Sequence, residues 1–173
     1  MINIIVAESH PVVRHGLNRT LGATGGFSII AEVDTMEGLW ENIGSPRVDV
    51  LICETALFKR RTFETLQRIK QRRPYIPIVV FSRYVDASYV VESFRGGAMA
   101  YVSKAASTDE LMTAIRQAVL GKNTSTRPYG ITQSMNRGKI PSWNSKPYPH
   151  GNPRCSILSS RESEAARLPD CSA

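Results

Sequence analysis

Residues 1–122 alternate between two apolar patterns, and this alternation constrains the fold more than any other feature of the chain. Short apolar runs bounded by turn-forming residues occupy positions 2–7, 27–33, 48–54, 76–82 and 98–103. Between them, apolar residues recur at helical spacing over positions 11–23, 35–43, 63–73, 87–97 and 108–121. Strands that alternate with helices of this length pair in parallel through right-handed crossovers. The pattern therefore predicts an α/β fold, a doubly wound five-stranded parallel sheet in which a helix follows each strand.

Local signals support these boundaries. Pro11 can begin the first helix, where its missing N–H costs nothing. Ser107 and Glu110 have the spacing of a capping box at the start of the fifth helix. The runs 48–54 and 76–82 are almost continuously apolar, which is typical of strands covered by helices on both faces.

Composition places the chain among globular proteins. Hydrophobic residues make up 42% of it and charged residues 21%. No run approaches the roughly 18 consecutive apolar residues of a membrane span, and the strand-like start lacks the basic region of a signal peptide. Three cysteines without a C-x-x-C pair argue against a disulfide framework or a cysteine zinc site. We expect a cytoplasmic protein without a membrane segment.

Residues 123–154 change character, because Pro, Gly, Ser and Asn dominate and no hydrophobic period continues. We interpret this stretch as a flexible basic linker. Residues 111–161 hold eight Lys and Arg and no acid, whereas residues 1–110 carry a net charge of only +1. Such a segment can bind nucleic acid nonspecifically. Its charges are thinly spread without an aromatic ladder, so we favour a solvated linker.

Polar side chains lie where the predicted strands end. They are Glu8, Ser9 and His10 after the first strand, Glu54 at the third, Ser82 at the fourth and Lys104 after the fifth. The carboxyl ends of parallel strands meet at one edge of the sheet, so these groups should converge. Carboxylates, a hydroxyl and an ammonium suit a phosphoryl group or Mg²⁺. An ion pair that caps the sheet edge is an equal alternative, and His10 is as well suited to capping the next helix as to chemistry.

Several stretches resemble one family of bacterial signalling proteins. IVAESHPVVRHGL, DVLICE, VVFS and GGAMAYVSKAAS followed by TDELMTAIRQAVLGK occur in order and at suitable separations. Together they resemble the receiver domain of a two-component response regulator of the NarL/FixJ type, over residues 1–122. The resemblance implies a flavodoxin-like fold, a (βα)₅ receiver with strand order 2-1-3-4-5. The segment ILSSRESEAARL is similar to the opening of a LuxR-type helix-turn-helix, so residues 155–173 are interpreted as a remnant of its start.

The resemblance also implies roles for the strand-end residues. Glu54 stands at the phosphoacceptor position, where the family has an Asp that takes a phosphoryl group from a histidine kinase. Glu8 and Ser9 stand at the acidic pair that helps to hold Mg²⁺, so Glu8 and Glu54 are the expected metal ligands. Ser82 and Lys104 match the phosphate-sensing residues, and Tyr101 matches the aromatic that changes rotamer on activation.

Two of these positions depart from the family pattern. Glu54 is one methylene longer than Asp, which displaces its oxygens by roughly 1 Å and costs on the order of 100-fold in a well-aligned transfer. Ser9 brings no charge to a cation that usually takes one or two carboxylates, so Mg²⁺ should bind weakly or not at all. We expect Glu54 to reach toward Lys104 and Ser82 instead. A carboxylate there would mimic phosphoaspartate and bias the switch without phosphate.

These considerations favour an atypical response regulator in signal transduction and transcription regulation, not an enzyme. Its expected partners are a sensor histidine kinase or another response regulator, and a second copy in a homodimer. Residues 155–173 supply at most the first helix of a DNA-binding module, so specific DNA binding by this chain alone is not expected. The alternatives are a conventional phosphorelay receiver, a nucleic-acid binder through residues 111–161, and a small enzyme that uses Glu8, Glu54 and Lys104 on a phosphorylated substrate.

Overall fold

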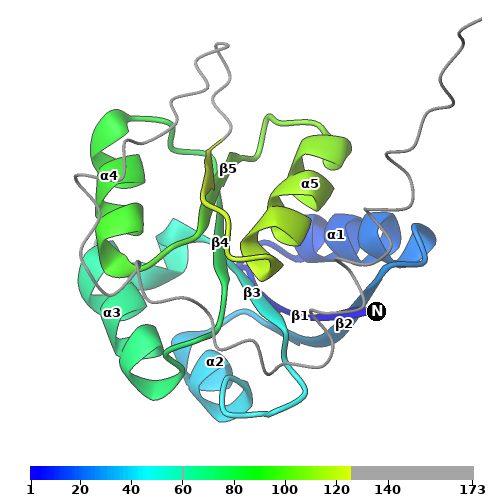
Figure 1. Cartoon of the computed structure of the whole chain (residues 1–173), viewed down its shortest axis with the longest axis horizontal. Coiled ribbons are helices and arrows are strands. Elements are labelled where there is room, and N and C mark those ends of the chain that lie inside the picture. Colours follow the sequence, from blue (N-terminus) through cyan, green and yellow to red (C-terminus); the bar gives the residue numbers. More distant parts are fainter. Residues whose placement is uncertain (60, 126–173) are drawn as a thin grey trace, which may run out of the picture.

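A computed structural model of the chain describes residues 1–59 and 61–125. Its centre is a parallel sheet in the order β2-β1-β3-β4-β5-β6 (Figure 1). The strands are β1 (Ile2–Ala7), β2 (Phe27–Val33), β3 (Val50–Cys53), β4 (Ile78–Ser82), β5 (Ala100–Ser103) and β6 (Thr124–Ser125). The helices are α1 (Pro11–Ala23), α2 (Met36–Asn42), α3 (Thr62–Arg72), α4 (Ala87–Gly96) and α5 (Thr108–Val119), with a 3₁₀ turn, η1 (Thr55–Phe58).

The predicted fold is confirmed. Five parallel strands have the order 2-1-3-4-5, and a helix follows each of them. The two-residue β6 pairs in parallel with β5 at Ala100 and Tyr101. The sheet therefore extends three residues beyond residue 122, into the stretch interpreted as a linker.

Three strands begin two residues later than predicted, although the preceding residues are buried. Val48, Ile76 and Ala98 are at most 5% exposed. Their backbone N–H groups bond to nearby turn and helix carbonyls, those of Ser45, Arg73 and Ser93. An apolar run marks burial, and burial reaches into the loops that lead into each strand.

Helices cover both faces of the sheet. Helices α1 and α5 lie on one face, and α2, α3 and α4 lie on the other (Figure 1). Each face has its own core, one around Ile4, Leu21 and Ile115 and the other around Ile5, Leu66 and Phe94. Successive residues of a strand point to opposite faces, so Ile4 and Ile5 in β1 serve different cores.

Local chemistry explains where several helices begin and end. Pro11 is the first residue of α1, as predicted. The capping box of Ser107 and Glu110 is present at the start of α5, with both reciprocal hydrogen bonds formed. Gly97 ends α4 with a φ of 116°, a left-handed conformation that glycine adopts without steric cost.

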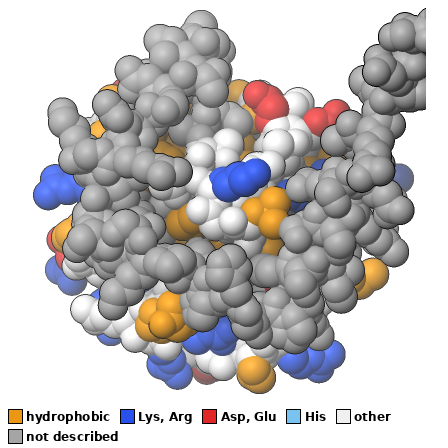
Figure 2. Space-filling view, viewed as in Figure 1, with side chains coloured by type: hydrophobic (Ala, Val, Ile, Leu, Met, Phe, Trp, Pro, Cys, Tyr) orange, Lys and Arg blue, Asp and Glu red, His pale blue; other side chains and the backbone are white. Residues whose placement is uncertain are grey.

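Basic, acidic and hydrophobic side chains are interspersed on the surface that the described residues present in Figure 2. Among the described helices, none is both long and apolar enough to cross a membrane. The second capping box, Ser159 and Glu162, and most of the basic segment 111–161 lie outside the described residues, as does the segment resembling a helix-turn-helix. Predictions about them stay predictions.

Candidate functional site

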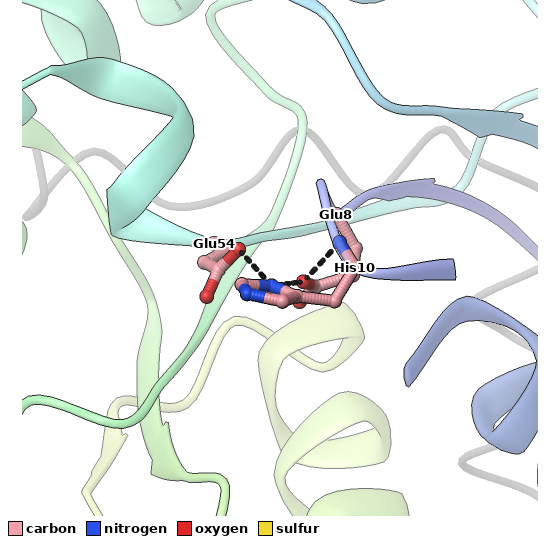
Figure 3. Close-up of side chains that lie close together, drawn as sticks. All are labelled: Glu8, His10 and Glu54. Carbon is pink, nitrogen blue, oxygen red and sulfur yellow. Dashed lines mark hydrogen bonds and ion pairs between the residues drawn. The ribbon is translucent and has the colours of Figure 1, made fainter. Parts of the chain in front are cut away.

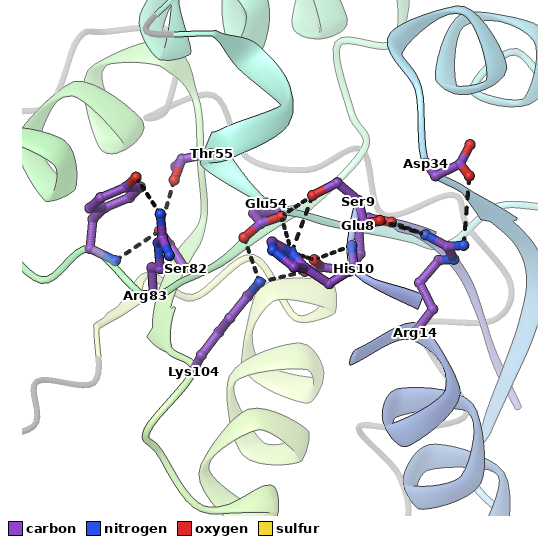
Figure 4. A network of polar contacts seen from close by, with 11 residues as sticks. Glu8, Ser9, His10, Arg14, Asp34, Glu54, Thr55, Ser82, Arg83 and Lys104 are labelled. Carbon is purple, nitrogen blue, oxygen red and sulfur yellow. Dashed lines mark hydrogen bonds and ion pairs between the residues drawn. The ribbon is translucent and has the colours of Figure 1, made fainter. Parts of the chain in front are cut away.

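The strand-end residues converge at one edge of the sheet, as their sequence positions predicted. Glu8, Ser9 and His10 lie in the turn between β1 and α1, and Glu54 follows β3 directly. Lys104 follows β5 and reaches between the two carboxylates (Figure 4). Parallel pairing of β1 with β3, and of β4 with β3 and β5, places these ends side by side.

Lys104 joins the two carboxylates through a three-way ion pair. Its Nζ atom lies 2.5 Å from Oε1 of Glu54 and 2.7 Å from Oε2 of Glu8. Glu54 is 1% exposed and Glu8 is 2% exposed, so these contacts are little screened by water. Burial alone would raise the pKa of Glu54, but hydrogen bonds with Lys104, Glu8 and Ser9 and the charge of Lys104 outweigh burial and lower it to about 2. Glu54 is therefore an anion at neutral pH.

The other oxygen of each carboxylate faces His10 (Figure 3). The Nδ1 atom of His10 lies 2.8 Å from Oε1 of Glu8 and 3.3 Å from Oε2 of Glu54. Oε2 of Glu54 also accepts a hydrogen bond from the hydroxyl of Ser9 at 2.9 Å. The backbone N–H of His10 donates to Oε1 of Glu8 at 2.9 Å. All four carboxylate oxygens of the pocket thus have a protein partner.

The structure excludes one of the two roles that the sequence left open for His10, that of capping the helix with its side chain. His10 is the N-cap residue of α1, but its side chain makes no capping hydrogen bond. The imidazole turns instead to the two carboxylates, so its place is in the pocket. Its position directly after Glu8 and Ser9 was the only sequence signal.

Arg14 is a residue of the site that the sequence analysis did not single out. One of its terminal nitrogens, Nη1, donates to the carbonyl oxygens of Glu8 at 2.6 Å and Ser9 at 3.2 Å. Its guanidinium also lies 3.6 Å from a carboxylate oxygen of Asp34. Arg14 therefore positions the turn that carries Glu8, through the backbone.

Ser82 does not bond Glu54, so the prediction that Glu54 reaches both Lys104 and Ser82 is right only for Lys104. The Oγ atom of Ser82 lies 2.7 Å from the hydroxyl of Thr55 and accepts from the N–H of Tyr84 at 3.2 Å. The carbonyl of Tyr84 in turn accepts from the hydroxyl of Tyr101 at 2.6 Å. This Thr55–Tyr101 chain connects the residue after Glu54 with a tyrosine that is 1% exposed.

The pocket fits Mg²⁺ poorly. Mg²⁺ takes oxygen ligands at about 2.0–2.1 Å in near-octahedral geometry and is usually held by one or two carboxylates. Here Lys104 already contacts one oxygen of each carboxylate. The second oxygen of Glu8 contacts the imidazole nitrogen of His10, and the second oxygen of Glu54 accepts from the hydroxyl of Ser9. An ion that entered this pocket would therefore meet an imidazole nitrogen as well as carboxylate oxygens, a mixed donor set that Mg²⁺ does not favour.

Comparisons with known proteins agree with this architecture. Residues 4–116 match the family model described as "Response regulator receiver domain". The chain is 27% identical over 120 residues to the transcriptional regulatory protein DegU of Brevibacillus brevis, covering 69% of this chain and 51% of that protein. It is 25% identical over 122 residues to the response regulator GacA of Pseudomonas aeruginosa, covering 70% of this chain and 57% of that one. The chain thus spans just over half the length of these relatives.

Solved structures show the same fold. A two-component response regulator of the LuxR family from Aurantimonas sp. SI85-9A1 superimposes with a TM-score of 0.66 at 23% identity, over 73% of this chain and 89% of that one. The isolated REC domain of RcsB from Salmonella enterica serovar Typhimurium, in the presence of the phosphomimetic BeF₃⁻, superimposes with a TM-score of 0.65 at 20% identity. The match covers 72% of this chain and 93% of that one. At these identities the likeness concerns the fold.

Proposed function

The chain belongs to the response regulator receiver domain family, and from that premise we propose that its receiver signals without phosphorylation, Glu54 serving as a permanent mimic of phosphoaspartate. One observation carries the proposal. The carboxylate of Glu54 already holds the ammonium of Lys104 at 2.5 Å, at the strand ends where a phosphoryl group on a shorter aspartate would meet that ammonium.

A fixed anion at this place can act on the rest of the domain through two connections. The first is the ion pair itself, which holds the ends of β3 and β5 together. The second is the Thr55–Tyr101 chain, which begins one residue after Glu54 and ends on β5. Phosphorylation switches proteins by changing charge and packing at one site and so biasing a two-state element. A permanent carboxylate supplies part of that charge continuously.

The same contacts disfavour phosphoryl transfer to Glu54. An attacking oxygen has to be aligned with the phosphoryl group, and the contacts of Oε1 with Lys104 and of Oε2 with Ser9 hold the carboxylate of Glu54 in one orientation. The lowered pKa of Glu54, about 2, also makes it a weaker nucleophile. Weak Mg²⁺ binding removes the cation that neutralises developing charge in phosphoryl transfer.

Partners are proposed by class. The relatives are response regulators and transcription regulators by name, so we assign this chain to two-component signalling that ends in transcription control, with no enzymatic turnover of its own. Structures of RcsB show it bound to the promoter rprA and as two dimers on two parallel DNAs. By analogy we propose a homodimer, or contact with another regulator or a sensor histidine kinase, as the means of output.

Intact mass spectrometry tests the proposal. The whole chain is incubated with acetyl phosphate and Mg²⁺, beside a Ser9→Asp, Glu54→Asp double variant that restores both the second acid and the shorter acceptor. We expect no adduct on the unchanged chain and a phosphoryl adduct on the double variant. A stoichiometric adduct mapped to Glu54 would favour a conventional phosphorelay receiver instead.

A further inference from the structure

We propose that Glu8, His10 and Glu54 form a binding site for a divalent transition-metal ion of the zinc type, an ion that takes nitrogen as well as oxygen ligands. The site shares Glu54 with the proposed function but uses different atoms. Metal binding therefore does not depend on the proposed function, and only its effect on signalling does.

The spacing of the donor atoms is close to that of a tetrahedral site. Zinc lies about 2.0–2.2 Å from imidazole nitrogen and carboxylate oxygen, so neighbouring donors of a tetrahedron are about 3.3–3.5 Å apart. Nδ1 of His10 lies 3.3 Å from Oε2 of Glu54 and 2.8 Å from Oε1 of Glu8. The three ligand atoms all lie within 4.8 Å of one another. The separation of 2.8 Å between Nδ1 of His10 and Oε1 of Glu8 would have to widen by about 0.5 Å to admit the ion.

Lys104 does not occupy the same oxygens. It contacts Oε2 of Glu8 and Oε1 of Glu54, whereas His10 faces Oε1 of Glu8 and Oε2 of Glu54. Each carboxylate can thus hold the ammonium with one oxygen and a metal ion with the other. The ion would replace the proton between Nδ1 of His10 and Glu8, and the Glu54–Lys104 contact would remain.

The charge of the pocket leaves room for a further cation. Two buried carboxyl groups face one ammonium, so one negative charge is left over when both carboxyl groups are ionised and His10 is neutral. Arg14 directs Nη1 to backbone carbonyls and pairs with Asp34 outside the pocket. The exposed guanidinium of Arg83 is a more distant positive charge that interacts with Glu54. A dication bound to His10 and to the carboxylate oxygens that face it would change the net charge of the pocket from −1 to +1.

Ligand positions are already held, and the ion has a route from solvent. The side chain of His10 is 55% exposed, whereas the two carboxylates behind it are buried. Arg14 holds the carbonyl of Glu8, and the N–H of His10 holds its Oε1, so little ordering is needed on binding. The hydroxyl of Ser9 lies 3.2 Å from Nδ1 of His10, which leaves it or a water molecule as the fourth ligand.

The donor set selects against Mg²⁺. Imidazole suits Zn²⁺, Ni²⁺ and Cu²⁺, whereas Mg²⁺ is bound through carboxylates, carbonyls and water. Replacement of the second acid by Ser9, with His10 turned into the pocket, exchanges an oxygen-only set for a mixed one. The geometry therefore points to a change of metal preference at this sheet edge.

Calorimetric titration of the whole chain with Zn²⁺ alone, and separately with Mg²⁺, tests the inference. The background carries Cys155→Ser, Cys171→Ser and His150→Ala to remove other zinc ligands. His10→Ala and His10→Gln are compared with His15→Ala, a matched control because His15 is an exposed histidine of α1. We expect one Zn²⁺ per chain, at least 10-fold weaker Mg²⁺ binding, and a 10- to 100-fold loss of Zn²⁺ affinity on either change of His10 but not of His15.

Equal Zn²⁺ affinity in the His10 variants and in the His15 control would overturn the inference, as would preference for Mg²⁺. These outcomes are independent of the phosphorylation test. If the chain binds Zn²⁺ through His10 and also accepts phosphate on Glu54, the metal site is supported and the proposal that Glu54 mimics phosphoaspartate is refuted. If the chain neither binds Zn²⁺ through His10 nor accepts phosphate, only the proposal that Glu54 mimics phosphoaspartate is supported.

Discussion

The Nζ atom of Lys104 lies 2.5 Å from Oε1 of Glu54, although fifty positions separate the two residues in the chain. Each residue directly follows a strand, so the contact depends on the pairing of β3 with β4 and of β4 with β5. It also depends on side-chain reach, because β4 lies between β3 and β5 in the sheet.

This ion pair predicts how acid affects stability. The pKa of Glu54 falls from an ordinary 4.5 to about 2 on folding, so the folded state holds the carboxylate ionised where the unfolded chain would protonate it. The stabilisation is complete above about pH 4.5 and is lost as pH falls toward 2. In Glu54→Gln we expect urea unfolding between pH 5.5 and 3 to show a smaller fall in stability. Exposed Glu64→Gln is the control, and equal slopes in the two variants would contradict the assignment.

The buried lysine Lys70 leads us to expect that the stability of the fold depends on pH in the alkaline range. Burial lowers its pKa from 10.5 to about 8, while its Nζ donates to the carbonyl of Ile76 at 2.7 Å. Below pH 8 the lysine is charged in both states, and its burial opposes folding. Between about pH 8 and 10.5 the unfolded chain binds more protons, so this contribution raises stability as pH rises. Unfolding of Lys70→Met should lack that rise, and a parallel alkaline profile would count against it.

Gly96 marks the close approach of α3 and α4. A Cβ atom there would lie 2.9 Å from Cβ of Leu66 and 3.1 Å from the carbonyl oxygen of Phe63. Gly96→Ala should therefore force the helices apart and destabilise the domain by about 1–3 kcal/mol. Gly16→Ala in α1 meets nothing within 4 Å, and should stabilise by roughly 0.5–1 kcal/mol. Denaturant midpoints measure both, and the same sign in the two variants would refute the packing argument.

Tyr101 predicts a link between the sheet and the loop after β4. Its hydroxyl donates to the carbonyl of Tyr84 at 2.6 Å, and Tyr84 donates to Ser82. Tyr101→Phe removes the first bond without a cavity and should cost about 0.5–1.5 kcal/mol. Hydrogen exchange of the Tyr84 amide should quicken, while amides of α1 are unchanged. If exchange at Tyr84 is unaltered, the Thr55–Tyr101 chain does not hold the loop.

The sequence alone determined the architecture and the meeting of Glu8, Glu54 and Lys104 at one edge of the sheet. Periodicity of two kinds separates strands from helices, and Pro11 and Ser107 mark helix starts by chemistry confined to a few neighbouring residues. Parallel pairing then brings the strand ends to one edge, so the meeting of Glu54 with Lys104 followed from topology and side-chain reach.

Only the tertiary structure decided which atom faces which. It turned His10 to the carboxylates, paired Ser82 with Thr55 in place of Glu54, and brought Arg14 to the backbone of the turn. It also placed the first residues of β3, β4 and β5, since buried loop residues and paired strand residues are equally apolar in sequence. These outcomes depend on differences of about an ångström between segments tens of residues apart. Such differences follow from how the helices pack on the sheet, which no local pattern records.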